Sequence, residues 1–342
     1  MKMKKYYWIN GAIFLIGALM ALFGFWNDGV RKFYLGEDFH PVIDRSAAEY
    51  NKFHVKTLKE PFNEVRVSLR STNLAITKGD HFEVKYEINR PVEEFKIEKG
   101  VLYVDEKHME FSNRAKRSPQ LTITVPDVNS LNSVAINWSP EGNEISLSDL
   151  KLQQLSLHYM PLQDWSSQIL LNKVDVSQKM RTDGGNFVIQ DSHLTNWEGK
   201  SSNGGDTKYL IQNSEITDFQ VESNQYFEVS LANSKLLGKN ELSGRGSSTM
   251  NVEDSQINNC QIKIDEIHLN MKRSQLLGDN RAKGHQLFID SSQLNEDLSI
   301  KVKADTASGT VDGQEIQAGF ERERSNNDSI EIKGDEVKLE MK

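Results

Sequence analysis

The sequence has almost no cysteine and few apolar residues. Cys260 is the only cysteine among 342 residues, which excludes an internal disulfide and every disulfide-stapled scaffold. Hydrophobic residues make up 37% of the chain, and the mean hydropathy is −0.57. This polar balance suits a fold with many exposed edges and turns rather than a compact α/β enzyme. The length still allows a sizeable buried core.

Patterns for metal binding and catalysis are also missing. The eight histidines lack the spacing of metal ligands, and no Gly-Gly-x-Gly-x-Asp repeat of calcium-binding β-rolls is present. Acidic residues are plentiful, but no pair of them is clustered with His and Arg. We therefore expect no metal, no cofactor and no catalytic residue, with a β-helix carbohydrate-active enzyme as the enzymatic alternative.

Long apolar runs are absent with one exception, the 19 uncharged residues from Trp8 to Trp26. This length predicts a transmembrane helix, and its terminal tryptophans suit the membrane interface. Lys2, Lys4 and Lys5 precede it, which predicts a cytoplasmic N-terminus. A cleavable signal peptide is the alternative, but its apolar core is usually only ~7 to 15 residues long. Lipid attachment is excluded because Cys260 is far from this segment.

The rest of the chain is acidic. It holds 38 basic and 49 acidic residues, a formal charge of −11. This charge disfavours nucleic acid and anionic lipid as general partners. A long exported chain without disulfides favours a bacterial cell envelope. We expect a cytoplasmic tail at 1–7, an anchor at 8–26, a stalk at 27–60 and an extracytoplasmic β-domain at 61–342.

Alternating apolar residues predict strands at both ends of this β-domain. From 61 to 126 they are separated by the turn signals "TKGDH" and "EKG" and predict an antiparallel N-terminal module. Residues 301–342 are expected to form a C-terminal cap. It would end in a hairpin, "SIEIKGDEVKLEM", in which Ile330 and Ile332 face Val337, Leu339 and Met341 across a Lys-Gly-Asp turn.

An eight-residue frame recurs between these ends, at 127–300. Its order is apolar, any, apolar, any, corner, Ser, any, apolar. Six copies fit: "FVIQDSHL" at 187, "YLIQNSEI" at 209, "VSLANSKL" at 229, "MNVEDSQI" at 250, "LNMKRSQL" at 269 and "LFIDSSQL" at 287. "ISLSDLKL" at 145 and "ILLNKVDV" at 169 fit with an aliphatic residue in place of serine. A period of about 20 residues predicts an all-β solenoid, single-stranded, with about eight coils and hairpin caps.

The frame has a physical interpretation. The apolar positions point inward, and the fifth position turns a corner, where Asn and Asp tolerate the left-handed backbone. The sixth positions predict a ladder of small residues beside the corners: Ser192, Ser214, Ser234, Ser255, Ser274 and Ser292. A ligand-binding row of hydroxyls and carboxylates is the functional alternative, but corner formation and stacking account for these residue types.

The sequence resembles the putative-adhesin family of bacterial β-strand-repeat surface proteins, a group of unknown function. The resemblance rests on "FNEVRVSLRSTNLAITKGDHFEVKYE", "GVLYVDE" and "LTITVPDVNSLNSVAI", followed by the short strands, and covers 62–310. Family members carry Gly at the corner where this chain has Asp-Ser or Asn-Ser. The resemblance implies a single-stranded β-solenoid, often membrane-anchored and often associated with envelope-stress systems. It supplies no catalytic residue.

Four aromatic residues remain as recognition candidates, because the frame requires no bulky side chain at their positions. They are Trp138, Tyr159, Trp165 and Trp197. The alternative is that they plug the ends or irregular coils of the solenoid. Cys260 is expected to be a small buried or groove residue, because no activating base is visible. The basic loop "RAKR" at 114–117 could meet an anionic wall polymer or be a solvated connection.

These features predict a non-enzymatic protein of the cell membrane. It would cross the membrane once and present its β-solenoid outside the cytoplasm as a binding, adhesion or envelope-stress signalling scaffold. An envelope polymer or a membrane protein is the expected partner, and no nucleic acid is expected. The alternative role is a self-associating structural envelope element, since an uncapped β-stack can polymerise end to end.

Overall fold

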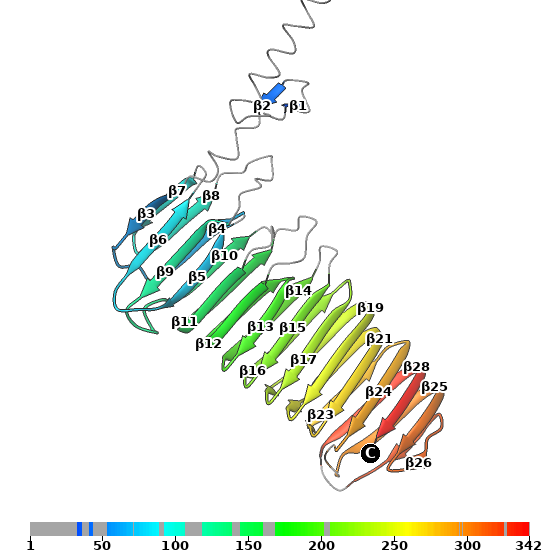
Figure 1. Ribbon diagram of the computed structural model, residues 1–342. Coiled ribbons are helices and arrows are strands. Elements are labelled where there is room, and N and C mark those ends of the chain that lie inside the picture. The colour runs from blue at the N-terminus through cyan, green and yellow to red at the C-terminus, as the bar shows by residue number, and fades with distance from the viewer. Residues whose placement is uncertain are drawn as a thin grey trace, which may run out of the picture. The chain divides into compact units, whose positions relative to one another are not determined.

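The computed structural model describes the chain at residues 33–35, 41–43, 53–70, 72–88, 92–106, 118–138, 144–159, 168–201, 206–293, 295, 297–324 and 327–341. The chain divides into two units. In the first, Met1–Phe53 with Glu110–Arg117, the described strands β1 (Phe33–Leu35) and β2 (Pro41–Ile43) pair antiparallel. The second unit, His54–Met109 with Ser118–Lys342, contains the stack of strands in Figure 1.

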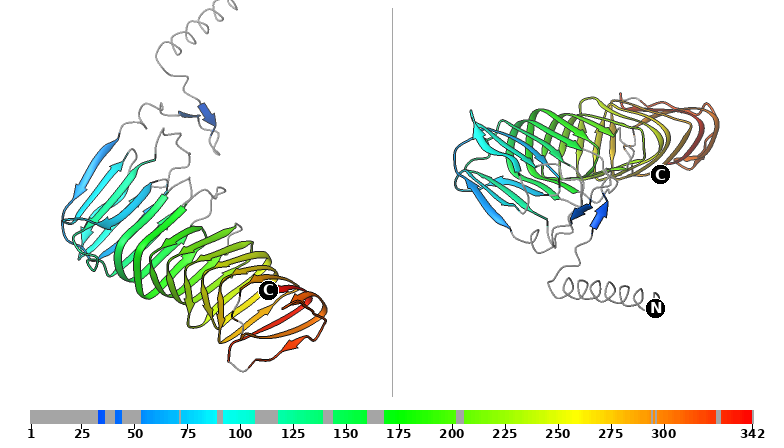
Figure 2. Two further views of the ribbon diagram at one scale, coloured as in Figure 1. Left: turned by 60° about the horizontal axis from the view of Figure 1, so that its bottom comes forward. Right: turned by 90° about the horizontal axis from the view of Figure 1, so that it is seen from above.

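The middle of the second unit is a parallel stack. Its strands are β10 (Ser133–Trp138), β11 (Glu144–Tyr159), β12 (Gln168–Asp183), β13 (Asn186–Gln190), β14 (His193–Ser201), β15 (Thr207–Gln212), β16 (Glu215–Ser223), β17 (Phe227–Ala232), β18 (Lys235–Leu237), β19 (Asn240–Glu253), β20 (Gln256–Asn258), β21 (Cys260–Lys272), β22 (Gln275–Leu277), β23 (Asp279–Lys283) and β24 (Gln286–Ser292). Strands of successive coils pair in parallel, as in β13–β15–β17–β19. Figure 2 shows the resulting coils edge-on. Over the described residues this confirms the all-β, solenoid-like prediction.

The inward side chains of successive coils stack on one another. Ile189, Ile211 and Leu231 occupy the third frame position in three coils, are paired in register and are at most 2% exposed. Burial of an aliphatic side chain of this size contributes about 1.5–3 kcal/mol. Because the same position is apolar in every coil, the core runs through the stack as one cluster.

Each regular coil turns at two left-handed corners. The first is at the fifth frame position, where Asp191 and Asn213 have φ of 49° and 48°, as the frame predicts. The second follows five residues later, at Asn196 and Asp218, with φ of 50° and 59°. Later coils place Gly238, Asn259 and Gly278 at this second corner. All are residue types that tolerate positive φ, so one spacing rule generates both corners.

The N-terminal end is built differently from the prediction. Its strands are β3 (His54–Leu58), β4 (Glu64–Leu69), β5 (Asn73–Lys78), β6 (Glu83–Ile88), β7 (Val92–Glu98), β8 (Val101–Glu106) and β9 (Gln120–Val125). β4 and β5 pair in parallel with β8 and β9 on one side and with β10 and β11 on the other. The antiparallel pairs at this end are β3–β6, β6–β9 and β7–β8.

The prediction of an antiparallel module is therefore wrong for β4 and β5, which pair only in parallel, and incomplete for β8 and β9, which pair in both ways. Alternation of apolar residues reveals a strand but not its partner, so the two arrangements look alike in sequence. The β7–β8 hairpin is confirmed, with its turn at Lys99 and Gly100, both in the left-handed region. β3 lies in the segment predicted as the end of the stalk, 27–60, yet pairs with β6.

The C-terminal end also departs from the prediction. Its strands are β25 (Ser299–Val311), β26 (Gln314–Glu315), β27 (Glu321–Arg322) and β28 (Ser329–Met341). The hairpin predicted at 329–341 does not form, because β28 is one bent strand that pairs in parallel along its whole length. It lies between β23–β24 and β25, as Figure 1 shows. The last strand in the chain is thus not the last strand in the stack.

The predicted tail at 1–7 and anchor at 8–26 lie outside the described residues. Among the residues that are described, no helix is long and apolar enough to cross a membrane.

Candidate binding site

Five of the six predicted serines form the ladder. The backbone N–H of Ser192 donates to the hydroxyl of Ser214 at 3.1 Å, and that of Ser214 donates to Ser234 at 3.2 Å. The same contact joins the next two serines, Ser255 and Ser274. Each hydroxyl in turn donates to the carbonyl oxygen two residues earlier, at 2.6–2.8 Å. These hydroxyls are committed to the corners, so the ladder is structural rather than a ligand-binding row.

Ser292 is not part of the ladder, which corrects the prediction. In β24 the register places Ser291 opposite Met271 and Ser292 opposite Lys272, two residues away from the predicted frame. The left-handed corner accordingly moves to Gln293, with φ of 59°. Ser291 takes the inward third position instead and is 2% exposed. The sequence "IDSSQ" offers two adjacent serines, and the buried Ile289 below them fixes which one turns inward.

The ladder predicts a measurable stability effect. Changing Ser214 to Ala removes the acceptor of the buried Ser192 N–H, and we expect this to lower the free energy of unfolding by about 1–3 kcal/mol. Urea denaturation followed by circular dichroism measures it. Ser230, on the outer face, holds only a 3.4 Å contact from Asn251, so Ser230→Ala is a matched control with an expected loss below about 0.5 kcal/mol. Equal losses in the two variants would contradict the ladder.

The tryptophan recognition candidates are buried, which corrects their proposed exposure. Trp138 is 1% exposed and Trp197 is 0% exposed. Trp197 packs against Phe187, Tyr209 and Phe219, with ring centroids 4.8–5.9 Å away. Both tryptophans occupy inward positions of a coil where neighbouring coils leave room for a large side chain. Trp165 lies outside the described residues, as does the side chain of Tyr159, whose backbone ends β11.

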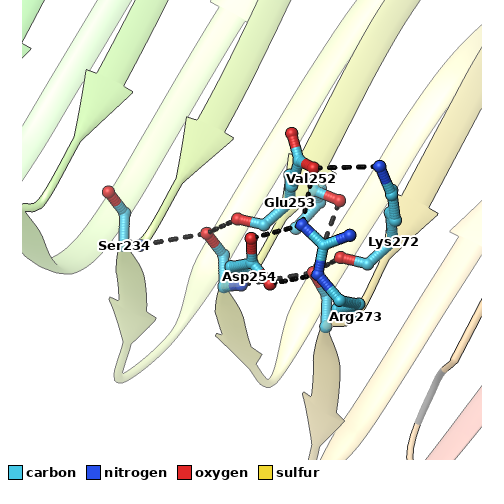
Figure 3. A network of polar contacts seen from close by, with 8 residues as sticks. Ser234, Val252, Glu253, Asp254, Lys272 and Arg273 are labelled. Carbon is cyan, nitrogen blue, oxygen red and sulfur yellow. Dashed lines mark hydrogen bonds and ion pairs between the residues drawn. The ribbon is translucent and has the colours of Figure 1, made fainter.

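Two other residues that could suggest chemistry are structural. Cys260 is buried, and burial raises the pKa of its thiol to about 12, so it is not an activated nucleophile, as predicted. Arg273 stands at a left-handed corner where the three preceding coils have Asn213, Asn233 and Asp254. Figure 3 shows it turned back onto the preceding coil, where it pairs with Asp254 at 2.6 Å and Glu253 at 2.7 Å.

The charges around Arg273 are therefore neutralised within the protein. The guanidinium holds the pKa of Asp254 below its usual range, and Lys272, followed by Arg273, does the same for Glu253. These groups are exposed to solvent, so the pairing adds little to stability. It leaves no unpaired charge at this corner for a ligand.

A groove of about 650 Å³ lies on the last coils, beside the turn that joins β23 to β24. Four lysines line it in register on adjacent strands: Lys263 of β21 faces Lys283 of β23, which faces Lys333 of β28, which faces Lys303 of β25. Adjacent strands are about 4.8 Å apart, so the row is roughly 14 Å long. We call it the lysine row. Because β28 lies between β23 and β25, Lys333 lies between Lys283 and Lys303 in this row.

Acidic and imidazole groups form a second row along the same groove. Asp265, His285, Asp335 and Asp305 each follow one of these lysines by two residues and line the same groove. We call it the acidic row. His285 contacts Asp335, with Nδ1 and Oδ2 2.7 Å apart, and this hydrogen bond raises the pKa of the imidazole above its usual value. The groove is thus bipolar across its width.

The ion pairs leave part of each row unused. Lys263 pairs with Glu241 at 2.7 Å, and Lys303 pairs with Glu331, both away from the acidic row. Among the described residues, Lys283 and Lys333 have no ion-pair partner, and neither does Asp305. Two neighbouring ammonium groups and a carboxylate across from them are therefore available to a ligand.

Sequence reasoning missed this groove, although a signal was present. Lysine is followed two residues later by Asp or His in "KID" at 263, "KGH" at 283, "KAD" at 303 and "KGD" at 333. We interpreted the last of these as ordinary hairpin turn chemistry. Its place within the continuous strand β28 shows that it belongs to the groove instead.

Comparison with solved structures finds similarities to several bacterial proteins. No protein-family model and no curated protein sequence matches it. A putative adhesin from Bacteroides fragilis is 11% identical, with 85% of this chain and 97% of that chain covered and a TM-score of 0.28. A putative lipid-binding protein from Parabacteroides distasonis is 11% identical, with 84% and 96% covered and a TM-score of 0.36. A putative cell adhesion protein from Clostridium sporogenes is 9% identical, with 85% and 100% covered and a TM-score of 0.18. These are likenesses to bacterial proteins of that description.

Proposed function

We propose that the protein is a non-enzymatic, membrane-anchored component of a bacterial cell envelope whose β-solenoid serves as a binding scaffold. The anchor is the apolar segment at 8–26, and the solenoid lies outside the cytoplasm. Its partner is an envelope polymer or another membrane protein. The observation that carries the binding role is the bipolar groove, because it gathers charged groups from four strands, and those at Lys283, Lys333 and Asp305 have no ion-pair partner among the described residues.

The fold supports a scaffold rather than a reaction centre. Polar groups that repeat from coil to coil are used in hydrogen bonds that hold the corners: the ladder serines at the first corners, and Asn196, Asp218 and Asn259 at the second. The groove residues are different, because they project outward on a rigid parallel stack. A rigid stack that presents charges at a fixed spacing is suited to recognition of an extended partner.

Self-association is the weaker alternative because of how the stack ends. The parallel strand β9 is covered by β6, and β6 by β3. β3 is short, and Lys56 stands at its centre, a charge of the kind that discourages edge-to-edge pairing. At the other end β26 and β27 pair with parts of β25. A monomer is therefore expected for the full chain in detergent, by sedimentation.

In-cell crosslinking tests the proposed function. A photoreactive amino acid at Asp305, in the groove, is expected to capture a wall polymer or membrane protein, while one at Glu228, on the face formed by β15 and β17, should not. Capture only of other copies of the chain would favour self-association. Equal capture from both positions, or none from either, would sink the binding role.

Two further measurements test the rest of the proposal. The protein is expected to stay in the membrane fraction after alkaline carbonate, with an intact N-terminus by mass spectrometry. Release, or an N-terminus beyond Trp26, would show that the segment is a cleaved signal. Hydrolysis of wall glycan by the full chain that disappears after a single acid is changed would refute the non-enzymatic role.

A further inference from the structure

We propose that the bipolar groove binds a zwitterionic aminophosphate, a phosphate group joined to a primary amine by a short chain. This inference names the ligand class of the groove and rests on the proposed binding function. The lysine row holds the phosphate and the acidic row holds the ammonium group. The phosphate can belong to a lipid headgroup or to a soluble or polymer-borne phosphodiester, which share this chemistry.

The lysine row supplies the anion site at its centre. Lys283 and Lys333 are directly opposite each other on β23 and β28, about 4.8 Å apart at the backbone, and are free of ion pairs among the described residues. Two ammonium groups at this spacing can each contact a different oxygen of one phosphate. Lysine binds phosphate as a point charge, and a charge-assisted hydrogen bond is about twice as strong as a neutral one.

The acidic row supplies the cation site across the groove. Asp305 has no partner among the described residues, and Asp335 already holds His285 at 2.7 Å. Asp305 follows Lys303 by two residues on β25, one strand beyond Lys333. With strands about 4.8 Å apart and a two-residue step of about 6.6–6.8 Å, the backbones of Asp305 and Lys333 are about 8 Å apart. An ammonium group on the ligand would meet Asp305 while its phosphate meets Lys333 and Lys283.

Small residues make the groove deep enough for a ligand. Gly284, Gly334 and Ala304 stand between the charged residues of β23, β28 and β25. A Cβ at Gly284 would lie 2.0 Å from the carbonyl oxygen of Ile264, so no larger residue fits where the two strands approach. The floor is therefore backbone and methyl groups, and the charged side chains form the walls.

Charge argues for a zwitterion over a simple ion. A pure polyanion would be repelled by the acidic row and by a chain whose formal charge is −8. A pure cation would be attracted by the acidic row but repelled by the lysine row beside it. Only a ligand that carries both charges pairs with the two rows together, whereas an ion of one sign would be attracted by one row and repelled by the other.

Calorimetric titration of the full chain in detergent tests the proposal. Glycerophosphoethanolamine is the zwitterionic probe, glycerol 3-phosphate carries the anion alone, and ethanolamine carries the cation alone. We expect the zwitterion to bind at least about tenfold more tightly than either half. Equal affinity for glycerol 3-phosphate would overturn the proposal in favour of a simple anion site, and no binding of any probe would also overturn it.

Variants assign the two halves of the site. The double change Lys283→Gln and Lys333→Gln is expected to weaken binding of the zwitterion about tenfold or more. Asp305→Asn should remove only the preference for the zwitterion over glycerol 3-phosphate. Lys338→Gln, an exposed lysine of β28 outside the groove, is the matched control and should bind as the unchanged chain does. All these positions are on the surface, so circular dichroism should show unchanged folding; loss of binding in the control too would contradict the assignment.

Vesicles distinguish the two sources of the ligand. Co-flotation of the chain with phosphatidylethanolamine vesicles through the groove residues, beyond that of the double lysine variant, supports a lipid headgroup. Binding of the soluble probe without this difference supports a polymer-borne or free phosphodiester. Capture of a partner from Asp305 in cells, with no affinity for any aminophosphate, would leave the binding function standing and refute this ligand.

Discussion

Replacing Trp197 by Ala is expected to lower the free energy of unfolding by about 3–5 kcal/mol. The side chain is 0% exposed, its ring lies 4.8 Å from that of Phe219, and its indole N–H donates to the hydroxyl of Thr182 at 3.0 Å. Alanine would leave a cavity that stacked coils cannot close, because the strands on either side hold their spacing through backbone hydrogen bonds. Urea denaturation monitored by circular dichroism measures the loss.

Two variants sharpen this prediction. Trp197→Phe keeps an aromatic ring but strands the Thr182 hydroxyl, and we expect a loss of about 1–3 kcal/mol. Lys200, exposed on the same strand, is the control, and Lys200→Ala should cost less than about 0.5 kcal/mol. A change below about 1 kcal/mol for Trp197→Ala would return this residue to the surface and to the recognition role that its sequence position suggested.

The repeated part of the fold is readable from sequence because one rule acts in every coil. An inward apolar pair, a left-handed corner and a small polar residue recur, so each copy supports the others. Ser192 and Asp191 could therefore be placed from the frame alone, and the structure confirms both. The second corner follows the same logic, but Asn196, Asp218 and Gly238 differ enough to hide its spacing.

The ends and the large aromatics could not be placed in this way. A parallel coil and a hairpin share the same alternation of apolar residues, so β28 looked like two strands of a hairpin. Trp197 looked like an exception to the frame because its neighbours at this position are smaller or polar, as Asn240 is two coils further on. Whether such a side chain is buried depends on the space left by adjacent coils, which is a property of packing and not of the repeat.

The candidate site could be predicted from the sequence only in part. Each Lys-x-Asp or Lys-x-His triplet is visible in the sequence, but its meaning depends on which strands are neighbours. Chain order would place Lys303 beside Lys283, whereas the structure places Lys333 between them. Because Lys303 is paired with Glu331 and Lys333 is not, only the spatial order brings two unpaired lysines together.

The position of β28 inside the stack predicts what happens when it is removed. Ending the chain after Arg324 should release β25, because β28 is its only parallel partner among the described residues and β26 and β27 pair with only a few of its residues. Five apolar side chains of β28 are buried against the core, which together contribute on the order of 10 kcal/mol: Ile330, Ile332, Val337, Leu339 and Met341. In the truncated chain, amide hydrogens at 299–311 are expected to exchange as in an unfolded segment, while those of β19 and β21 remain protected.

Hydrogen exchange followed by mass spectrometry distinguishes this order of strands from a simple one. If the chain ended in an outermost hairpin, removing it would leave the residues before it in place, and 299–311 would stay protected. A point variant gives the same test in the intact chain. Leu339→Ala should cost about 2–5 kcal/mol and speed exchange in both β24 and β25, because Leu339 pairs with Ile289 on one side and Gly309 on the other. Lys338→Ala, one residue away and exposed, should change neither, so faster exchange on one side of β28 alone would show that it lies at an edge.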